Sequence, residues 1–134
     1  MTHILDTDVV IDILAGREST IRVVDALNAE PAISVIKVGE YYEGIFGSQD
    51  PAESERRFEQ HKASFRIYDV TLPIMKRCGW IRRYLRDSGQ LIPDFDIVIA
   101  ATALEHDLIL ITRNTNHFAR VGGLRLYDWN ASLD

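Results

Sequence analysis

Three acidic residues that lie far apart in the chain stand where carboxylates could work together: Asp6, Glu40 and Asp96. Asp6 directly follows a short apolar run that predicts a strand over 2–5. Glu40 lies in the helix expected after a strand over 32–35, and Asp96 lies in the first turn of a later helix. The carboxyl ends of strands in an open parallel sheet meet in one crevice. Carboxylates gathered there repel one another, so the pattern predicts a site for a divalent cation.

Several polar residues accompany these acids. Asn114 follows a buried strand predicted over 108–112, where a fourth acid would complete the set, and it offers a neutral oxygen. The hydroxyls of Thr7 and Thr112 can support ligand carboxylates through hydrogen bonds. Arg113 is placed to face phosphate. His117 is close enough in sequence to join the site, although a histidine here could equally cap a helix or pack.

The types of ligand available also limit which metal ion the site would bind. The histidines and the single cysteine show no zinc-ligand spacing, and the chain has no glycine-rich phosphate loop and no Gly-x-Ser-x-Gly turn. Ligands that are all oxygen favour Mg²⁺, with Mn²⁺ as the alternative.

A second interpretation of the first acids stays open at this point. The segment Asp6-Thr7-Asp8-Val9-Val10 has the spacing of the haloacid-dehalogenase phosphatases, in which the first aspartate is a nucleophile. That chemistry needs a later lysine and an acidic pair after a further strand. Lys37, Lys62 and Lys76 follow no convincing strand, and the chain is short for that fold, so the metal site is the preferred interpretation.

Helical periodicity predicts how Glu40 is presented. In its helix, one apolar arc is expected to face the core, and it consists of Val35, Val38, Tyr42, Ile45 and Phe46. Glu40 lies off this arc, on a face shared with Gly44 and Gly47. Two glycines cost a helix about 1 kcal/mol each relative to alanine, which indicates a close approach of another chain. A frayed helix end with a surface glutamate is the other possibility.

Asp96 stands in a helix that is apolar nearly all round, so it is expected to be mostly buried. It shares a face with Ala100 and Ala103, whose small side chains leave room for an ion. Asp94 is expected to cap this helix, which leaves Asp96 free for function. Burying a carboxylate without a partner costs several kcal/mol.

The remaining elements alternate between strand and helix. The chain is expected to form strands over 2–5, 32–35, 108–112 and 124–127, and helices over 9–15 (capped by Asp8), 20–29, 36–46, 51–64, 72–87 and 94–106. Such alternation predicts right-handed βαβ units and a central parallel sheet with helices on both faces. The helix-rich middle predicts a helical arm beside that sheet.

Length and composition predict one α/β domain over 1–134, because 134 residues with 46% hydrophobic side chains can bury a full core. No apolar run is long enough to span a bilayer, and the lone Cys78 is expected to fill core space, so a reducing cytoplasm is favoured. Residues 52–92 carry nine Lys and Arg against five Asp and Glu, within a chain of net charge −5. Arg82, Arg83 and Arg86 in this basic part are candidate RNA contacts beside the acidic centre. A solvated, salt-bridged surface explains the same charges.

The chain resembles a known family over nearly its full length. The matching pieces are Leu5-Asp6-Thr7-Asp8, Gly39-Glu40, Asp96-Ile97-Val98-Ile99-Ala100-Ala101-Thr102-Ala103, Thr112-Arg113-Asn114 with His117-Phe118, and the closing Gly123-Leu124 and Asp128-Trp129. In this order and spacing they are similar to the PIN-domain ribonucleases of the VapC type, the toxins of bacterial toxin–antitoxin pairs. The resemblance implies a three-layer PIN-like fold.

The resemblance also implies a function. It makes Asp6, Glu40 and Asp96 the acidic metal ligands of an Mg²⁺-dependent endoribonuclease that cleaves structured RNA, often tRNA. It implies a homodimer and a cognate VapB-type antitoxin that wraps the toxin. The family's fourth acid falls near Asn114 or His117, and neither is acidic. A non-catalytic PIN-like module that binds RNA or protein is therefore the alternative.

Overall fold

A parallel sheet of five strands forms the centre of the computed structural model, which describes residues 3–27 and 29–130. The strands are short and are β1 (His3–Leu5), β2 (Ala32–Ser34), β3 (Arg66–Tyr68), β4 (Ile109–Ile111) and β5 (Arg125–Leu126). Their order across the sheet is β3-β2-β1-β4-β5, and every neighbouring pair is parallel. The first strands therefore add on one side of β1, and β4 and β5 add on its other side. The strand order changes direction between β1 and β4, which is where α/β folds place their ligands.

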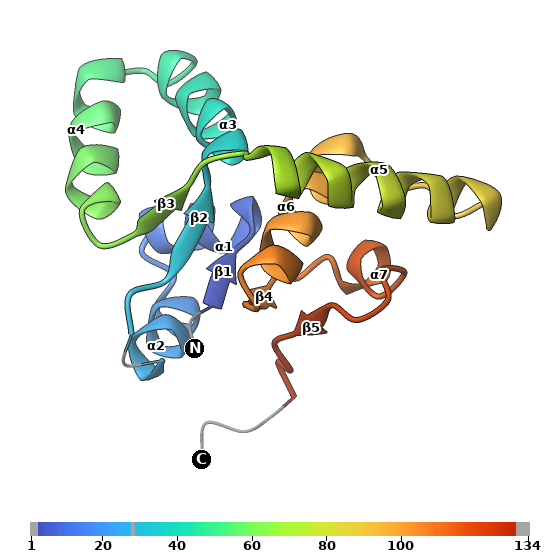
Figure 1. Ribbon diagram of the computed structural model, residues 1–134. Coiled ribbons are helices and arrows are strands. Elements are labelled where there is room, and N and C mark those ends of the chain that lie inside the picture. The colour runs from blue at the N-terminus through green and yellow to red at the C-terminus, as the bar shows by residue number, and fades with distance from the viewer. Residues whose placement is uncertain (1–2, 28, 131–134) are drawn as a thin grey trace.

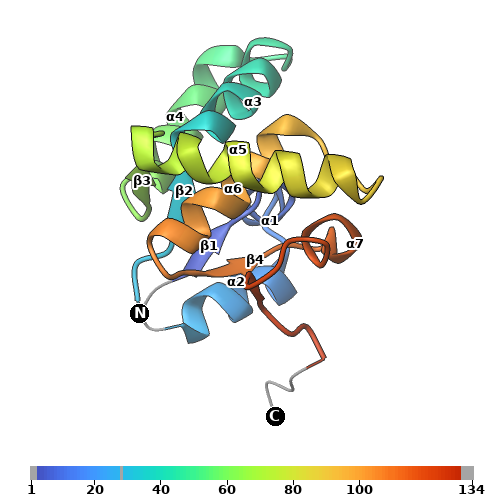
Figure 2. The ribbon, with the colours of Figure 1, turned by 45° about the vertical axis from the view of Figure 1, so that its right-hand side comes forward.

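Seven helices connect these strands in the described part of the chain. They are α1 (Thr7–Leu14), α2 (Glu18–Ala26), α3 (Val35–Phe46), α4 (Pro51–Lys62), α5 (Leu72–Asp87), α6 (Asp94–Glu105) and α7 (Thr115–Phe118). Figure 1 shows α3 and α4 side by side as an arm at one end of the sheet, and Figure 2 shows α5 and α6 together on one face with α2 on the opposite side.

Alternation along the strands divides the core into two halves. Ile4 and Leu110 pack with α5 and α6 on one face of the sheet. Their neighbours Leu5 and Ile111 pack with α1, α3 and α4 on the other face. Successive side chains of a strand point to opposite faces, so apolar runs such as these are buried on both sides. This gives the three layers of the expected fold, which is confirmed.

Several local expectations need correction. The strand β3 was not predicted, because its three residues are only partly buried and lie at the edge of the sheet. Asp8 does not cap α1: Asp6 occupies that position. Asp94 is not the cap of α6, because Pro93 stands there without a side-chain bond and Asp94 is the first helical residue. Thr2, the expected start of β1, lies outside the described residues. None of the described helices is long and apolar enough to cross a membrane.

Candidate active site

Asp6 is fixed at the carboxyl end of β1 by two hydrogen bonds. One carboxylate oxygen accepts from the backbone N–H of Thr7 at 2.8 Å, which caps α1, and the other accepts from Thr112 Oγ1 at 2.8 Å. Asp6 is buried, and its burial raises the pKa of the carboxyl, against the opposing effect of the Thr112 hydroxyl. Because β1 and β4 are neighbours, the residues that follow them meet as predicted at one edge of the sheet.

Asp96 approaches the same place from the first turn of α6. It is buried, and one of its oxygens lies 3.2 Å from His117 Nδ1. Asn114 Nδ2 lies 2.8 Å from the same ring nitrogen. A proton on Nδ1 would be donated to Asp96, and an unprotonated Nδ1 would accept from the Asn114 amide. The position expected for a fourth acid thus holds an amide and an imidazole, and the imidazole donates to Asp96 when Nδ1 carries the ring proton.

Lys37 lies between the acids and was not identified as a site residue. Its side chain is buried, and its Nζ lies 3.3 Å from Asp96 Oδ1, 3.4 Å from Glu40 Oε1 and 3.9 Å from Asp6 Oδ1. The argument that no lysine follows a strand was wrong for this residue, because β2 ends at Ser34 and α3 begins at once. A basic residue one helical turn before Glu40 was the available signal.

Glu40 is carried by a helix whose inward face differs from the expected arc. The buried residues of α3 are Lys37, Tyr41 and Ile45, whereas Val35 and Phe46 are exposed. The helix is therefore rotated so that the lysine and Glu40 face the acidic centre. Gly44, one turn further on, lines a groove of about 320 Å³ between α1, α3 and α4, together with Glu40. Nothing lies within 4 Å of a Cβ placed on Gly44.

Several buried polar atoms next to Asp6 have no partner. Among the described residues, Asp8 Oδ1 has no hydrogen-bond partner, and the Thr7 and Tyr41 hydroxyls lie close to each other without forming a hydrogen bond of good geometry. Burial raises the pKa of Tyr41, against the opposing effect of the Thr7 hydroxyl, and the nearby carboxylates of Asp6 and Glu40 raise it further. The other Asp8 oxygen accepts from the backbone N–H of Arg113 at 3.0 Å. Unsatisfied buried groups of this kind carry a desolvation cost, and a bound ion or its waters would remove it.

The four candidate RNA contacts differ in their surroundings. Arg82 forms an ion pair of 2.8 Å with Asp94, which stands two residues before Asp96, and Arg83 pairs with Asp87. Arg86 is exposed on the last turn of α5.

Arg113 is engaged within the fold. Its Nε donates to Asp12 at 3.3 Å, its Nη2 donates to Thr20 at 3.0 Å, and its guanidinium lies 4.2 Å from the centre of the Trp129 ring. These contacts join β4 to α1, α2 and the C-terminal segment. They give Arg113 a structural role beside the predicted RNA contact.

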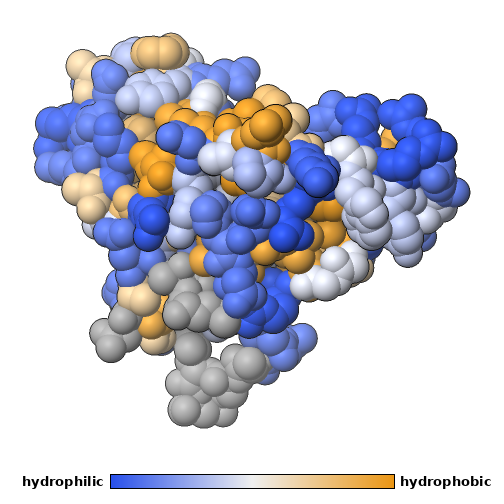
Figure 3. Space-filling view, viewed as in Figure 1, coloured by the Kyte–Doolittle hydropathy of each residue, from blue (hydrophilic) through white to orange (hydrophobic). Residues whose placement is uncertain are grey.

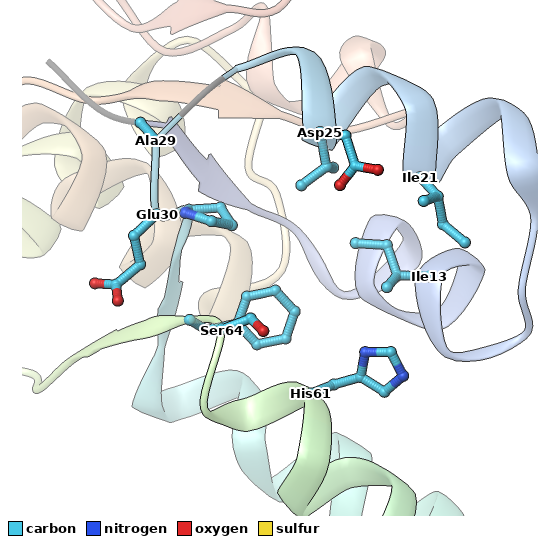
Figure 4. Close-up of a pocket in the computed structure, with 10 residues that line it drawn as sticks. Ile13, Ile21, Asp25, Ala29, Glu30, His61 and Ser64 are labelled. Atoms are coloured by element: carbon cyan, nitrogen blue, oxygen red, sulfur yellow. The ribbon is translucent and has the colours of Figure 1, made fainter.

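A pocket of about 410 Å³ lies elsewhere in the molecule (Figure 4). Its lining comes from α1, α2, the end of α4 and the segments that lead into β2 and β3, and it includes Ile13, Asp25, Glu30, His61 and Phe65. These segments precede the strands, so the pocket opens at the amino ends of the sheet. Asp6, Glu40 and Asp96 lie at the carboxyl ends of the strands, and none of these three lines this pocket.

The donor set suits a hard divalent cation, because three carboxylates of different elements point at one spot and buried oxygens nearby lack partners. The oxygens stand 3.3–3.9 Å from Lys37 Nζ, whereas Mg²⁺ draws its ligands to about 2.1 Å. Accordingly, no group of three or more acidic, histidine or cysteine side chains in the described chain has the spacing of a formed metal site. The chemical type of these ligands suits a divalent ion, whereas the distances between them in this structure suit the ammonium group of Lys37.

Comparisons with known proteins agree with this arrangement. The family model of the PIN domain matches residues 3–124. The tRNA(fMet)-specific endonuclease VapC of Shigella flexneri is 31% identical over 131 residues, which covers 97% of this chain and 99% of that protein. The DNA-bound VapBC of Salmonella typhimurium has a TM-score of 0.88 at 27% identity, covering 96% of this chain and 98% of the other. VapBC-1 of nontypeable Haemophilus influenzae has a TM-score of 0.85 at 29% identity, covering 96% and 98%.

The family model covers most of the chain, and the Shigella relative matches it nearly end to end. The resemblance noted in the sequence is confirmed, and the phosphatase interpretation of Asp6 is set aside. PIN nucleases of this type generally depend on a divalent metal. The chain belongs to the PIN-domain family, among its VapC-type ribonucleases.

Proposed function

We propose that this chain is an Mg²⁺-dependent endoribonuclease in which Asp6, Glu40 and Asp96 hold the metal, with Mn²⁺ as a substitute. The observation that carries the proposal is the convergence of these three carboxylates around Lys37 Nζ at the carboxyl edge of the sheet. These acids, from the end of β1, from α3 and from α6, share one cation there, and in this structure it is the Lys37 ammonium. The names of the curated relatives, ribonuclease and endonuclease, support the same reaction.

The side chains around the acids have distinct tasks in phosphodiester hydrolysis. A bound divalent ion would lower the pKa of an attacking water and neutralise charge that builds on the phosphate. The Thr112 hydroxyl holds Asp6 in one orientation, and His117 holds Asp96 when its Nδ1 carries the ring proton. Thr7 adds a buried hydroxyl beside Asp6. Attack by water leaves 5′-phosphate and 3′-hydroxyl ends, whereas attack by the ribose would leave a 2′,3′-cyclic phosphate.

RNA reaches these acids over a basic surface. Arg82, Arg83 and Arg86 lie on α5, which packs along α6, the helix that carries Asp96. Arginine contacts phosphate through a planar group with several donors, which suits a folded RNA backbone. Together with Arg113 they are the proposed RNA contacts. The substrate class we propose is structured RNA, with tRNA foremost, in line with the tRNA(fMet) specificity in the name of the Shigella relative.

The chain is also proposed to act as the toxin of a pair, bound by a VapB-type antitoxin and assembled as a homodimer. Solved structures similar to it are VapBC complexes. The groove beside Glu40 and Gly44 is open to a partner segment and adjoins the acids, so an antitoxin lying in it would cover the site. Apolar side chains gather over α3 and the start of α5 (Figure 3), and Leu72, Met75 and Trp80 on α5 are exposed, as a dimer contact requires.

The test is cleavage of RNA by the isolated chain with Mg²⁺ and with EDTA, beside the Asp96→Asn variant. This variant removes the negative charge of one proposed metal ligand, so the cleavage rate should fall by more than about 100-fold. Mutation of groups that only support a metal ligand already lowers activity by about 10–100-fold. Asp69→Asn, an exposed acid on the loop before α5, is the matched control and should cleave like the unaltered chain. Cyclic phosphate ends, or cleavage that persists in EDTA, would contradict the mechanism.

A non-catalytic module that binds RNA or protein remains the second candidate. The observation that favours it is the lysine among the acids, together with the neutral Asn114, because both weaken the attraction for a metal. This candidate predicts RNA binding that ignores Mg²⁺ and Asp96→Asn but falls when Arg82, Arg83 and Arg86 are replaced. Intact RNA in the cleavage test, from a chain shown to be folded, would support it.

A further inference from the structure

Lys37 is a buried cation with three acidic partners. Its side chain is 7% exposed, and its Nζ lies within 3.9 Å of an oxygen from each of Asp6, Glu40 and Asp96. An ammonium group has three N–H donors and no acceptor, so three carboxylates match its capacity. Removing such a group from water costs several kcal/mol unless charged partners compensate for it. The position of Lys37 is therefore set by the acids, as the position of a metal would be.

We infer that Lys37 is a built-in cation of the carboxylate cluster, and that it limits the site to one divalent metal ion, bound less tightly than the carboxylates alone would bind it. This inference deepens the proposed function and rests on it. The three acids carry a charge of about −3 and Lys37 about +1, and the remaining −2 equals the charge of one divalent ion. Asn114 adds no charge where a fourth acid would have made room for a second ion.

The geometry makes the lysine and the metal interact directly. The Asp96 and Asp6 oxygens that face Nζ are the ones that point to a shared ion. The second oxygen of Asp96 lies against His117 and that of Asp6 accepts from Thr112, while the facing Asp6 oxygen accepts from the Thr7 backbone N–H. An incoming ion therefore meets the ammonium at short range and is repelled by it. The long side chain of Lys37 can draw back while it keeps its charge nearby. This repulsion lowers the affinity of the site for the metal ion.

The first measurement is the number of Mn²⁺ ions bound per chain, by calorimetry and by the electron paramagnetic resonance of free Mn²⁺, on metal-free protein without RNA. We expect one ion for the unaltered chain. Two ions with intact Mg²⁺-dependent cleavage would overturn the inference and leave the proposed function standing. No uptake at all, with no effect of Mg²⁺ on cleavage, would overturn both.

The second measurement compares variants of Lys37. Lys37→Met keeps an unbranched side chain and removes the charge, so the Mn²⁺ dissociation constant should fall by roughly tenfold or more. Lys37→Arg keeps the charge and should bind Mn²⁺ as weakly as the unaltered chain. Lys76→Met, which removes an exposed lysine of α5, is the control for net charge and should change nothing. Equal affinity of Lys37→Met and the unaltered chain would overturn the inference.

Thermal melts cover the case in which Lys37→Met folds poorly. Without Lys37 the three carboxylates repel one another unopposed, so the variant should melt earlier in EDTA. The same high concentration of Mg²⁺ should then raise its Tm by more than it raises that of the unaltered chain, because the stabilisation by a bound ion grows with the logarithm of its concentration divided by its dissociation constant. Equal shifts in Tm for both proteins would count against a role of Lys37 in opposing the metal.

Discussion

At the scale of single residues, the site depends on how each carboxylate is held. Asp6 uses one oxygen for the cap of α1 and the other for Thr112, so both of its oxygens have fixed directions before any ion binds. Thr112 is itself fully buried, and its hydroxyl also accepts from the backbone N–H of Asn114 at 3.0 Å. One hydroxyl thus joins the acid of β1 to the loop that carries the fourth position.

Replacing that hydroxyl tests this arrangement. Thr112→Val keeps the shape of the side chain but leaves an Asp6 oxygen and the Asn114 N–H without their partner. We expect RNA cleavage to fall by about tenfold or more, as for other groups that orient metal ligands, and stability to fall by about 1–3 kcal/mol. Thr112→Ser retains the hydroxyl and should stay within about threefold of the unaltered rate. Cleavage and urea unfolding measure the two effects, and full activity of the valine variant would refute the role given to Thr112.

At the scale of elements, α5 connects the basic surface to α6, the helix that carries Asp96. Arg82 forms an ion pair with Asp94 at the start of α6, and Arg83 and Arg86 lie further along α5. The residues of α5 that pack into the core are apolar. This division places charge on the outside of α5 without disturbing its packing. The helix therefore tolerates substitution of its arginines, which allows a clean test of RNA binding.

Arg83→Ala with Arg86→Ala should weaken RNA binding uniformly across sequences. Each lost phosphate contact should reduce the slope of log Kobs against log salt by about 0.7–0.9. The helix should stay folded, because the Arg83–Asp87 pair is exposed and worth little. Arg56→Ala on α4, where the arginine is exposed and paired with Glu53, is the control. An unchanged salt slope in the double variant would show that RNA binds elsewhere.

The elements also show what could be predicted from the sequence. The apolar runs around β1, β2 and β4 and their alternation with helical segments made the parallel α/β fold predictable, so the residues after neighbouring strands could be brought together. The rotation of α3 could not be predicted, because apolar spacing alone placed Val35 and Phe46 inward and a lysine outward. Only the three carboxylates make a buried Lys37 favourable, and their meeting is a property of the tertiary structure.

For the same reason, the repulsion that the sequence predicts among the carboxylates is offset in the structure. Without a cation between the three acids, removing Asp96 would lower their repulsion and stabilise the metal-free protein. With the ammonium 3.3 Å away, Asp96 is instead a partner of a buried charge. Its loss takes away attraction as well as repulsion. The acids could be identified from the sequence. Whether Asp96 raises or lowers the stability of the metal-free protein depends on the position of Lys37, which only the structure shows.

At the scale of the whole molecule, His3 links stability to pH. It begins β1, is partly buried, and its Nδ1 is buried without a hydrogen bond. Burial, followed by the charge of Arg125, lowers the pKa of His3 from its ordinary value of 6.5. Between that lowered pKa and 6.5 the unfolded chain binds more protons than the folded one, so the contribution of His3 to stability rises with pH and is lost on acidification.

His3→Gln removes this titration and keeps a polar side chain of similar reach. The stability of the unaltered chain, relative to this variant, should therefore decline as pH falls below about 6.5. Urea unfolding at a series of pH values, with the difference between the two proteins plotted, isolates the histidine from the carboxylates that both share. A difference that stays constant through this range would show that His3 titrates alike in the folded and unfolded states.

The indole of Trp129 gives the molecule an optical reporter. Its Nε1 donates a 2.7 Å hydrogen bond to the carbonyl of Thr112, the residue whose hydroxyl holds Asp6, and its ring lies under Arg113. Trp80, the only other tryptophan in the chain, is 65% exposed. In a Trp80→Phe background, tryptophan fluorescence therefore comes from one indole alone, which is hydrogen-bonded to Thr112 directly after β4. Occupation of the acids by an ion can then be followed by light, in real time and without labels or RNA.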